Sequence, residues 1–377
     1  MQLRPVLILF VTLFIVMVGF GVIIPIMPFY AMKMGATAVH IGMLMASYSL
    51  MQFIFSPFWG TLSDKYGRKP LILVGLAGFT ITFIFFGLAH TLPLLFAARL
   101  LGGILSSACL PTAMAYIADT TTPEERGAGM GMMGAAMGLG VIVGPAIGGL
   151  LSVWHVGLPF FFCAGLAALN FIFAAIFLKE SKRHHDVSEV KYDRFKHLLS
   201  LRGYIAFAFF LVFLLSYSIS GFEGTFPLFA KVRFGYGARE MGIIFAFMGV
   251  IGVVLQGLLV GPMIKKFGEE QMIRFGLLVT ALGAFLTIFS FNLWSLTLFI
   301  CLTVIGQGLL RPSLASLISK DTEYEEGATM GAMQSVESFG RIVGPIAGGV
   351  IFQFSLNLPY VSTGGLNLLA LLAAFLL

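Results

Sequence analysis

The sequence contains Gly140-Val-Ile-Val-Gly144-Pro145-Ala-Ile-Gly148-Gly149, and 200 positions later it contains Gly340-Arg-Ile-Val-Gly344-Pro345-Ile-Ala-Gly348-Gly349. The match continues upstream at the same offset, where residues 125–131 correspond to residues 325–331. A self-similarity with so long a period indicates two equivalent halves. Parallel repeats of this kind are typical of transporters that rock about a site near the middle of the membrane. The repeat therefore predicts a transporter rather than a channel or an enzyme.

The composition also indicates a membrane protein. Of the 377 residues, 58% are apolar and 11% are charged, against roughly 45–50% and 25% in soluble globular proteins. The 39 phenylalanines exclude a disordered chain, and the three cysteines are too few to frame so long a disulfide scaffold. The same composition excludes the usual enzyme and nucleic-acid-binding classes.

Twelve stretches are long and apolar enough to be membrane helices, each of which needs about 20 mainly apolar residues. They are Pro5–Tyr30, Ile41–Leu62, Leu71–Ala89, Pro93–Ala118, Gly127–Ser152, Leu158–Leu178, Tyr204–Phe229, Met241–Ile264, Met272–Phe291, Trp294–Ile318, Ala328–Phe354 and Pro359–Leu377. The polar stretch 179–202 separates an N-terminal half (1–178) from a C-terminal half (203–377). The sequence therefore predicts an all-α membrane protein with twelve transmembrane helices in two six-helix, pseudo-symmetric halves joined by a cytoplasmic linker.

Lysine and arginine are concentrated in the loops on one side of the predicted membrane. Because positively charged loops stay in the cytoplasm, this bias places both termini inside. The formal net charge of +6 reflects this topology and does not indicate a nucleic-acid partner. The last span ends at Leu377 without a polar tail, so we expect the native chain to continue beyond it.

The loop between the second and third spans reads Gly60-Thr-Leu-Ser-Asp64-Lys-Tyr-Gly67-Arg68-Lys69. It resembles the signature loop of the major facilitator superfamily. Residues 140–149 resemble the helix 5 motif of antiporters in that superfamily, and residues 99–103 resemble its helix 4 arginine motif. The resemblance covers essentially the whole chain. It implies the major facilitator fold and transport by alternating access.

Within the superfamily, the chain resembles the twelve-helix drug:proton antiporters of the bacterial NorA and Bmr type. Glu223 in the seventh span and Arg311 in the tenth lie where that group has such residues. Members of this group usually have an aspartate three residues before the arginine, whereas this chain has Gly308 at that position. Conversely, we expect those pumps to have no residues equivalent to Glu337 and Arg341. The resemblance implies a multidrug efflux antiporter of the bacterial inner membrane, acting as a monomer, that exports amphipathic or cationic compounds. In such a transporter, the proton gradient supplies the energy for export and no cofactor is needed.

Two other transport functions stay open. Three arginines against two glutamates inside the spans also fit an exporter of an anionic or zwitterionic metabolite, siderophore or lipid. A proton-coupled nutrient importer fits the fold but not the antiporter-like motif. The sequence contains no recognisable metal site, catalytic group or phosphate-binding loop. The expected partners are therefore an amphipathic small molecule, protons and membrane lipids, with no nucleic acid.

The loop after the second span is predicted to act as a conformational latch on the inner face. Its candidate residues are Gly60, Asp64, Gly67, Arg68 and Lys69. The glycines allow tight turns, the aspartate accepts hydrogen bonds from the positive end of a helix, and the basic residues hold acids or lipid phosphates. The plainer interpretation is a positive loop that only sets topology. In the second half, Lys265 and Glu269 replace the aspartate and the arginine, so we expect an asymmetric latch.

Glycine and proline recur in the fifth and eleventh spans. The candidate residues are Gly140, Gly144, Pro145, Gly148, Gly149, Gly344 and Pro345. Glycine permits the close approach of two helix backbones, and proline removes a backbone donor and bends or breaks a helix. These residues either form helix contacts that change during transport or pack in a static interface of small residues.

Five ionisable side chains lie inside predicted spans: Arg99, Glu223, Arg311, Glu337 and Arg341. A charge in hydrocarbon is costly, so each is expected to face a cavity or a partner. Glu223 is the first candidate proton carrier, because burial favours the neutral form of a carboxylic acid. Its alternative role is that of an acid held at the outer interface by Lys231 or Arg233. Glycines and a proline around it favour an irregular helix there.

Glu337 has two interpretations. It is a second proton carrier, or it forms a structural pair with Arg341, four residues further along the same helix, or with Arg311 at a similar depth. An acid that is satisfied by an arginine stays charged and does not shuttle protons. Arg99, Arg311 and Arg341 are the candidate residues that organise charge or line the substrate cavity, and a purely structural role is the alternative for each.

Overall fold

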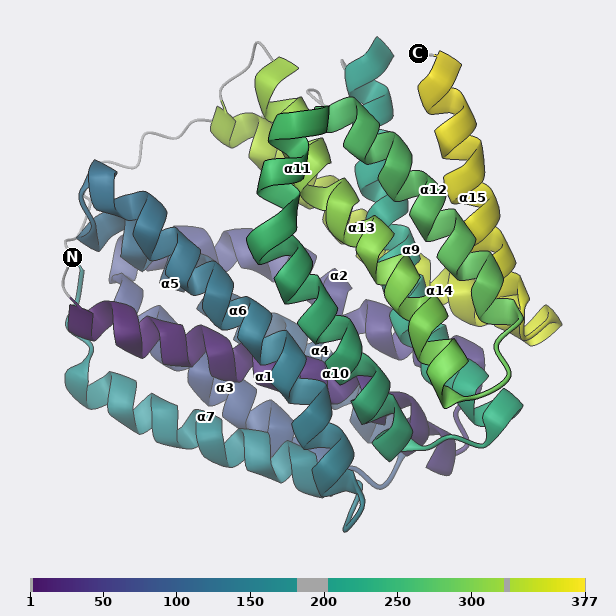
Figure 1. Cartoon of the computed structure of the whole chain (residues 1–377). Coiled ribbons are helices and arrows are strands. Elements are labelled where there is room, and N and C mark those ends of the chain that lie inside the picture. Colours follow the sequence, from purple (N-terminus) through teal and green to yellow (C-terminus); the bar gives the residue numbers. More distant parts are fainter. Residues whose placement is uncertain (1–2, 182–202, 322–325, 377) are drawn as a thin grey trace. The chain divides into compact units, whose positions relative to one another are not determined.

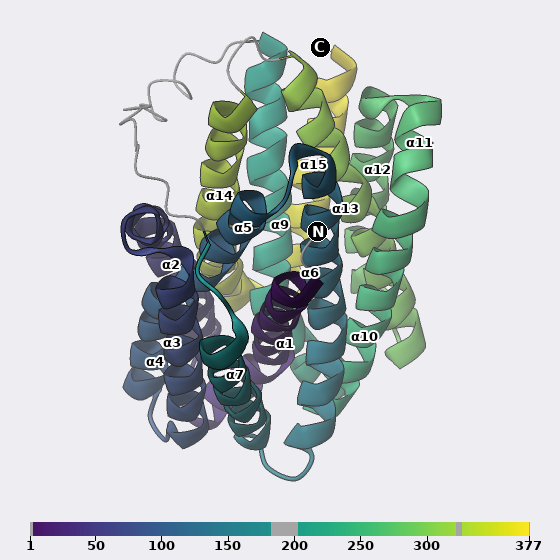
Figure 2. The same ribbon diagram turned by 90° about the vertical axis from the view of Figure 1, so that its left-hand side faces the viewer.

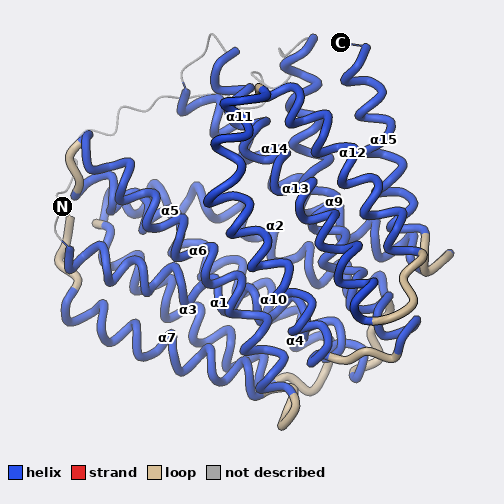
Figure 3. The backbone as a smooth tube through the Cα atoms, viewed as in Figure 1, coloured by secondary structure: helices blue, strands red, loops and turns tan. Residues whose placement is uncertain are grey.

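The chain is helical, with short connections and no strand, throughout the part that a computed structural model describes, residues 3–181, 203–321 and 326–376 (Figures 1 and 3). Before residue 181 the elements are α1 (Leu3–Lys33), α2 (Ala38–Tyr66), α3 (Arg68–Leu88), α4 (Leu92–Leu105), η1 (Ser106–Ala108), α5 (Cys109–Thr120), α6 (Pro123–Ser152) and α7 (Leu158–Phe177). After residue 203 they are α9 (Gly203–Phe234), α10 (Ala238–Val254), η2 (Leu255–Leu259), α11 (Val260–Phe267), α12 (Glu269–Ile288), α13 (Leu293–Asp321), α14 (Glu326–Phe354) and α15 (Leu358–Leu376). The prediction of an all-α protein is confirmed.

Each of the twelve predicted spans coincides with helical structure. The fourth comprises α4, η1 and α5, and the eighth comprises α10, η2 and α11. In the fourth, Pro111 lacks the N–H that would bond the carbonyl of Ser107, and the backbone tightens into the 3₁₀ turn η1 at that point. In the eighth, the backbone widens into the π-helical turn η2 around Gly257. Both spans therefore continue through a locally altered helix.

Eleven stretches of the described helices are long and apolar enough to cross a membrane. The helix α14 is not among them, and Glu337 and Arg341 interrupt its apolar residues. Residues 182–202 of the predicted linker lie outside the described residues. The division of the chain at 179–202 therefore stays a prediction.

Packing divides the chain into two compact units. One comprises Met1–Thr37, Ser47–Glu189 and Gly237–Ala246, and the other comprises Ala38–Ala46, Val190–Tyr236 and Phe247–Leu377. In the first unit, α1 lies along α6 and α3 lies along α7 (Figure 2). In the second unit, α9 lies along α14, and α12 packs against α13 and α15 (Figure 1). The first and fifth spans of each half are thus packed together, as are the third and the sixth.

A polar contact between the first and last spans also recurs. Asn170 Nδ2 donates to Thr12 Oγ1 at 2.9 Å and joins α7 to α1. Asn367 Nδ2 donates to Ser218 Oγ at 3.4 Å and joins α15 to α9. In each half, a buried asparagine of the last helix therefore fastens it to the first.

Two tight turns recur as well. Gly35 and Gly235 follow α1 and α9 with φ of 83° and 75°, and Gly67 and Gly268 precede α3 and α12 with φ of 101° and 82°. Residues with a Cβ rarely adopt such values, so these turns require glycine. The repeat seen in the sequence is therefore matched by a repeat of backbone geometry.

Candidate functional site

Arg311 of α13 and Glu337 of α14 form an ion pair within the second unit. Arg311 Nε donates to Glu337 Oε1 at 3.2 Å, and Nη2 donates to Oε2 at 3.0 Å. Such a two-bonded fork is among the strongest arrangements of arginine and carboxylate. The exposed fraction of the side chain is 54% for Arg311 but 5% for Glu337. A buried carboxylate is therefore covered by a guanidinium group that keeps one open side.

Arg341 lies one turn further along α14 from Glu337 and is partly buried. The described residues contain no ion pair between these two side chains, and both carboxylate oxygens of Glu337 bind Arg311. Of the two pairings that the sequence left open for Glu337, the structure therefore contains the one with Arg311 of the neighbouring helix. The sequence allowed both pairs; the fork geometry needs a guanidinium that approaches the carboxylate head-on.

Glu223 is partly buried in α9. The irregular helix expected around it is wrong, because α9 is one α-helix from Gly203 to Phe234 with Pro227 inside it. A membrane helix tolerates an internal proline when neighbouring helices pack around it. Arg233, considered above as a partner, lies over the ring of Phe229 at 5.6 Å. Glu223 is thus a partly buried acid in the middle of a continuous helix.

Arg99 of α4 is buried, with 3% of the residue exposed. Its guanidinium carbon lies 5.1 Å from the centre of the Tyr48 ring of α2. An aromatic face attracts a cation through the ring quadrupole, and more strongly when both are shielded from water. The Tyr48 hydroxyl lies 3.3 Å from Ser106 Oγ. Tyr48 is therefore a neighbour of Arg99 that the sequence did not point to.

The latch residues gather around Arg68, the first residue of α3. Its Nε donates to Asp119 Oδ2 at 2.9 Å, and its Nη1 contacts Asp64 and donates to Ser63 Oγ at 2.6 Å. These bonds join the end of α2, the start of α3 and the end of α5 within one unit. Arg68 thus contacts two acids, of which Asp119 was not foreseen from the sequence. Gly60 does not form a turn, because α2 continues to Tyr66.

Glu180, which follows α7, was also missed, and it caps α3. Its Oε1 accepts the backbone N–H groups of Arg68 at 2.7 Å and Lys69 at 3.3 Å. The first N–H groups of a helix have no intrahelical acceptor and carry partial positive charge, so a carboxylate there is stabilised. Glu180, and not Asp64, is therefore the acid at the N-terminus of α3. A separation of 112 residues between donor and acceptor left no local signal for this contact.

The second half contains the same ion pair with its charges exchanged. Glu269, the first residue of α12, is equivalent to Arg68, and Lys320 of α13 is equivalent to Asp119, each at an offset of 201. Lys320 Nζ and Ser316 Oγ both donate to Glu269 Oε1, the latter at 2.8 Å. The change from the basic Arg68 to the acidic Glu269 is therefore accompanied by a change from the acidic Asp119 to the basic Lys320.

The glycines of the repeated motif lie where two helix backbones touch. A Cβ at Gly144 of α6 would lie 2.4 Å from the carbonyl oxygen of Val18 in α1. A Cβ at Gly344 of α14 would lie 2.5 Å from the carbonyl oxygen of Tyr217 in α9. Only glycine fits at such distances. The neighbouring prolines lie inside α6 and α14 without breaking either helix.

Known proteins share this fold and this sequence pattern. A family model of the major facilitator superfamily matches residues 9–345 and 257–377. The chain belongs to the major facilitator superfamily. It is therefore a multi-pass membrane transporter of small molecules and not an enzyme.

Among its relatives in the superfamily is multidrug resistance protein 2 of Bacillus subtilis, with 32% identity over 95% of this chain and 91% of the relative. Quinolone resistance protein NorA of Staphylococcus aureus is 28% identical over 97% of this chain and 94% of the relative. The crystal structure of a point mutant of the nucleoside transporter NupG superposes with a TM-score of 0.85 and 14% identity, and the match covers 98% of this chain and 99% of that chain. The last similarity shows the fold alone.

Proposed function

We propose that this transporter exports amphipathic or cationic compounds across a bacterial cytoplasmic membrane in exchange for protons. It acts as a monomer, with both termini in the cytoplasm and without a cofactor. The observation that carries the proposal is the similarity, over nearly the whole chain, to proteins named for multidrug and quinolone resistance. Aromatic and methionine side chains, abundant in this chain, bind such compounds by dispersion and cation–π contact.

Glu223 is the proton carrier in this proposal. It is a partly buried acid inside one continuous membrane helix, where an ionisable group is costly and usually serves transport. Both oxygens of the other intramembrane acid, Glu337, are bound by Arg311. We therefore assign the Arg311–Glu337 pair to the organisation of charge.

The network around Arg68 is the latch of this proposal. Its bonds join the ends of α2, α3 and α5 to Glu180, three residues after the end of α7. Alternating access requires such contacts to break in one state and to form again in the other. The latch thereby stabilises one of the two states of the transport cycle.

A second candidate function is the export of an anionic or zwitterionic compound. It is favoured by the open side of Arg311, whose side chain is 54% exposed although it already holds Glu337. A half-exposed arginine inside a membrane helix is expected to face water rather than lipid. An anionic group is able to reach it there.

The test is ethidium efflux from proteoliposomes under an imposed pH gradient. We expect the parent protein to move ethidium, Glu223→Gln to abolish the movement, and Glu337→Gln to retain part of it. The matched control is Glu270→Gln, since this glutamate at the start of α12 has a side chain that is 58% exposed. Its rate is expected to equal that of the parent.

Two outcomes contradict the proposal. If Glu223→Gln moves ethidium at the parental rate, the carrier assignment fails. If the parent ignores ethidium but exports a fluorescent organic anion, and Arg311→Met abolishes that export, the second function replaces the first.

A further inference from the structure

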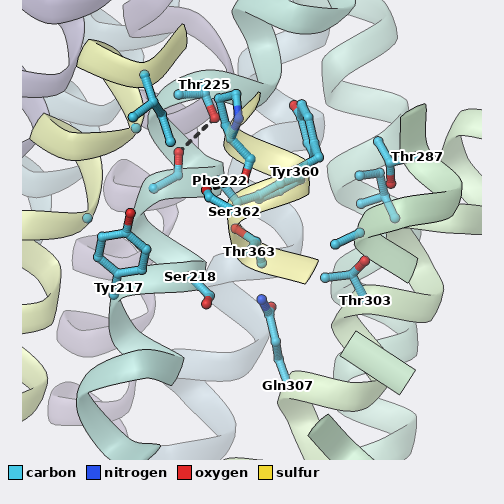
Figure 4. A pocket seen from close by; sticks show the side chains of 17 residues that line it. Tyr217, Ser218, Phe222, Thr225, Thr287, Thr303, Gln307, Tyr360, Ser362 and Thr363 are labelled. Atoms are coloured by element: carbon cyan, nitrogen blue, oxygen red, sulfur yellow. Dashed lines mark hydrogen bonds between the residues drawn. The ribbon is translucent and has the colours of Figure 1, made fainter. Parts of the chain in front are cut away.

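A cavity lies within the second unit, between α9, α12, α13, α14 and α15 (Figure 4). The space that the centre of a water molecule can occupy in it is small, about 20 Å³. Eight of the seventeen described residues that line it carry a hydroxyl group, and none of the seventeen carries a charge. Neither Glu223 nor the Arg311–Glu337 pair is among them. The cavity is therefore distinct from the charged residues of the proposed transport mechanism.

The two halves of the chain allow an internal comparison at this position. A Cβ at Gly75 of α3 would contact Cys109, and a Cβ at Gly276 of α12 would contact Leu310. Gly276 lies 201 positions after Gly75, and Leu310 lies 201 positions after Cys109. At this contact, α3 and α12 therefore pack in equivalent ways.

The equivalent space in the first unit is filled by phenylalanine rings. Ring centres are 4.2 Å apart for Phe79 and Phe83, 5.6 Å for Phe83 and Phe86, and 5.6 Å for Phe86 and Phe160. The corresponding residues of the second unit, at offsets of 201 in α12 and 200 in α15, are Thr280, Ala284, Thr287 and Tyr360. Three of the four rings are thus replaced by smaller side chains, of which Ala284 and Thr287 line the cavity, and the fourth ring is kept as Tyr360. The fold itself does not require the cavity.

The lining offers both kinds of hydrogen-bonding group. Thr225 Oγ1 and Thr287 Oγ1 donate to carbonyl oxygens of their own helices, those of Gly221 and Gly283, each at 2.8 Å. Their hydrogens are used, and their oxygens keep lone pairs that are able to accept. Gln307 Nε2 is buried and has no hydrogen-bond partner in the described part of the chain, and Figure 4 shows this side chain extending toward the hydroxyl groups. An unpaired buried donor is costly, and an acceptor from a ligand removes the cost.

We propose that this cavity binds an uncharged molecule rich in hydroxyl or amide groups. Such a ligand donates to the threonine oxygens and accepts from Gln307. A charged ligand is disfavoured, because burying a charge without a countercharge costs far more than burying a hydrogen-bonded polar group. The inference rests on the second unit alone and does not depend on the proposed efflux function.

Thr363 provides the test, since it lines the cavity and its equivalent in the first half is a native cysteine, Cys163. All three native cysteines are buried. In Thr363→Cys we therefore expect a neutral maleimide to label the new cysteine but not Cys163. Methyl α-glucoside, the uncharged probe, is expected to abolish labelling at saturation. Glucosamine adds a positive charge to the glucose ring, and glucose 6-phosphate adds a negative charge. We expect neither of them to protect.

Two further variants control the experiment. Ala284→Phe restores the ring of the first half, and we expect it to abolish protection by methyl α-glucoside. Leu282→Phe adds the same ring on the outer side of α12, where the residue is 47% exposed, and it is expected to leave labelling and protection unchanged. If Thr363→Cys does not yield monodisperse protein, Ser362→Cys takes its place.

Three results would overturn the inference. One is the absence of labelling in a folded cysteine variant. Another is the failure of methyl α-glucoside, glycerol and N-acetylglucosamine to protect, which would mean that the cavity holds only water. The third is equal protection by the charged sugars. Because none of these readouts uses the pH gradient, they are independent of the efflux assay.

Discussion

The difference in exposure between Arg311 and Glu337 makes a specific prediction about stability. Replacing Arg311 by methionine leaves a carboxylate with 5% side-chain exposure and removes both of its charge-assisted hydrogen bonds. Replacing Glu337 by glutamine leaves a guanidinium with 54% side-chain exposure, which water is able to solvate, and the amide oxygen still accepts one bond. The two single variants should therefore differ, although each breaks the same pair.

The expected magnitudes follow from the burial of each partner. Removing one member of a fully buried ion pair costs about 3–5 kcal/mol. Because the pair is open on the arginine side and solvent weakens it there, we place Arg311→Met at the lower end, a loss of about 3 kcal/mol. Glu337→Gln exchanges one charge-assisted bond for a neutral one and should cost about 1 kcal/mol. The double variant contains no unpaired buried charge, so it should be more stable than Arg311→Met alone.

Thermal unfolding of the purified protein in detergent, followed by circular dichroism, measures these differences. We expect the midpoint temperatures to fall in the order parent, Glu337→Gln, double variant, Arg311→Met. Equal losses in the two single variants, or a loss in the double variant equal to the sum of both, would contradict this prediction. Either result would mean that the carboxylate does not depend on the guanidinium.

Three further predictions concern the latch and the helix interfaces. Glu180→Ala removes the cap of α3 and should cost about 1 kcal/mol, seen as a lower midpoint of thermal unfolding. The charge-exchanged double variant Glu269→Lys/Lys320→Glu should keep the parental midpoint, whereas each single variant should lose up to about 1 kcal/mol; a double variant as unstable as either single one would contradict the pairing. Gly144→Leu places a side chain against a carbonyl oxygen 2.4 Å from the Cβ position, so fluorescence-detected size exclusion should show little monodisperse protein, while Gly131→Leu, with nothing within 4 Å, should resemble the parent.

The helical architecture was predictable because it is written in long, local patterns. Apolar stretches of membrane length mark each span, and the repeat around Gly144 and Gly344 marks the two halves. The turn at Gly67 was also predictable, since its φ of 101° is one that glycine alone adopts readily. The expectation for Gly60 was wrong, because a glycine inside an apolar stretch does not by itself end a helix.

The partners of the charged residues were predictable only in part. Depth along the spans allowed the pair of Arg311 with Glu337, but helical spacing equally allowed Arg341. Asp119, Tyr48 and Glu180 were missed because each meets its partner through packing between helices far apart in the sequence. A periodic pattern shows which face of a helix is apolar, but it does not show which neighbour covers that face.

Proton release on substrate binding shows whether a cationic substrate and a proton compete for Glu223. Tetraphenylphosphonium is added to purified protein in weakly buffered detergent solution near neutral pH, and the released protons are followed with a pH indicator. If they compete, protons are released in the parent and in Glu270→Gln, and none are released in Glu223→Gln. Cation binding without proton release in the parent, or unchanged release in Glu223→Gln, would contradict competition at Glu223.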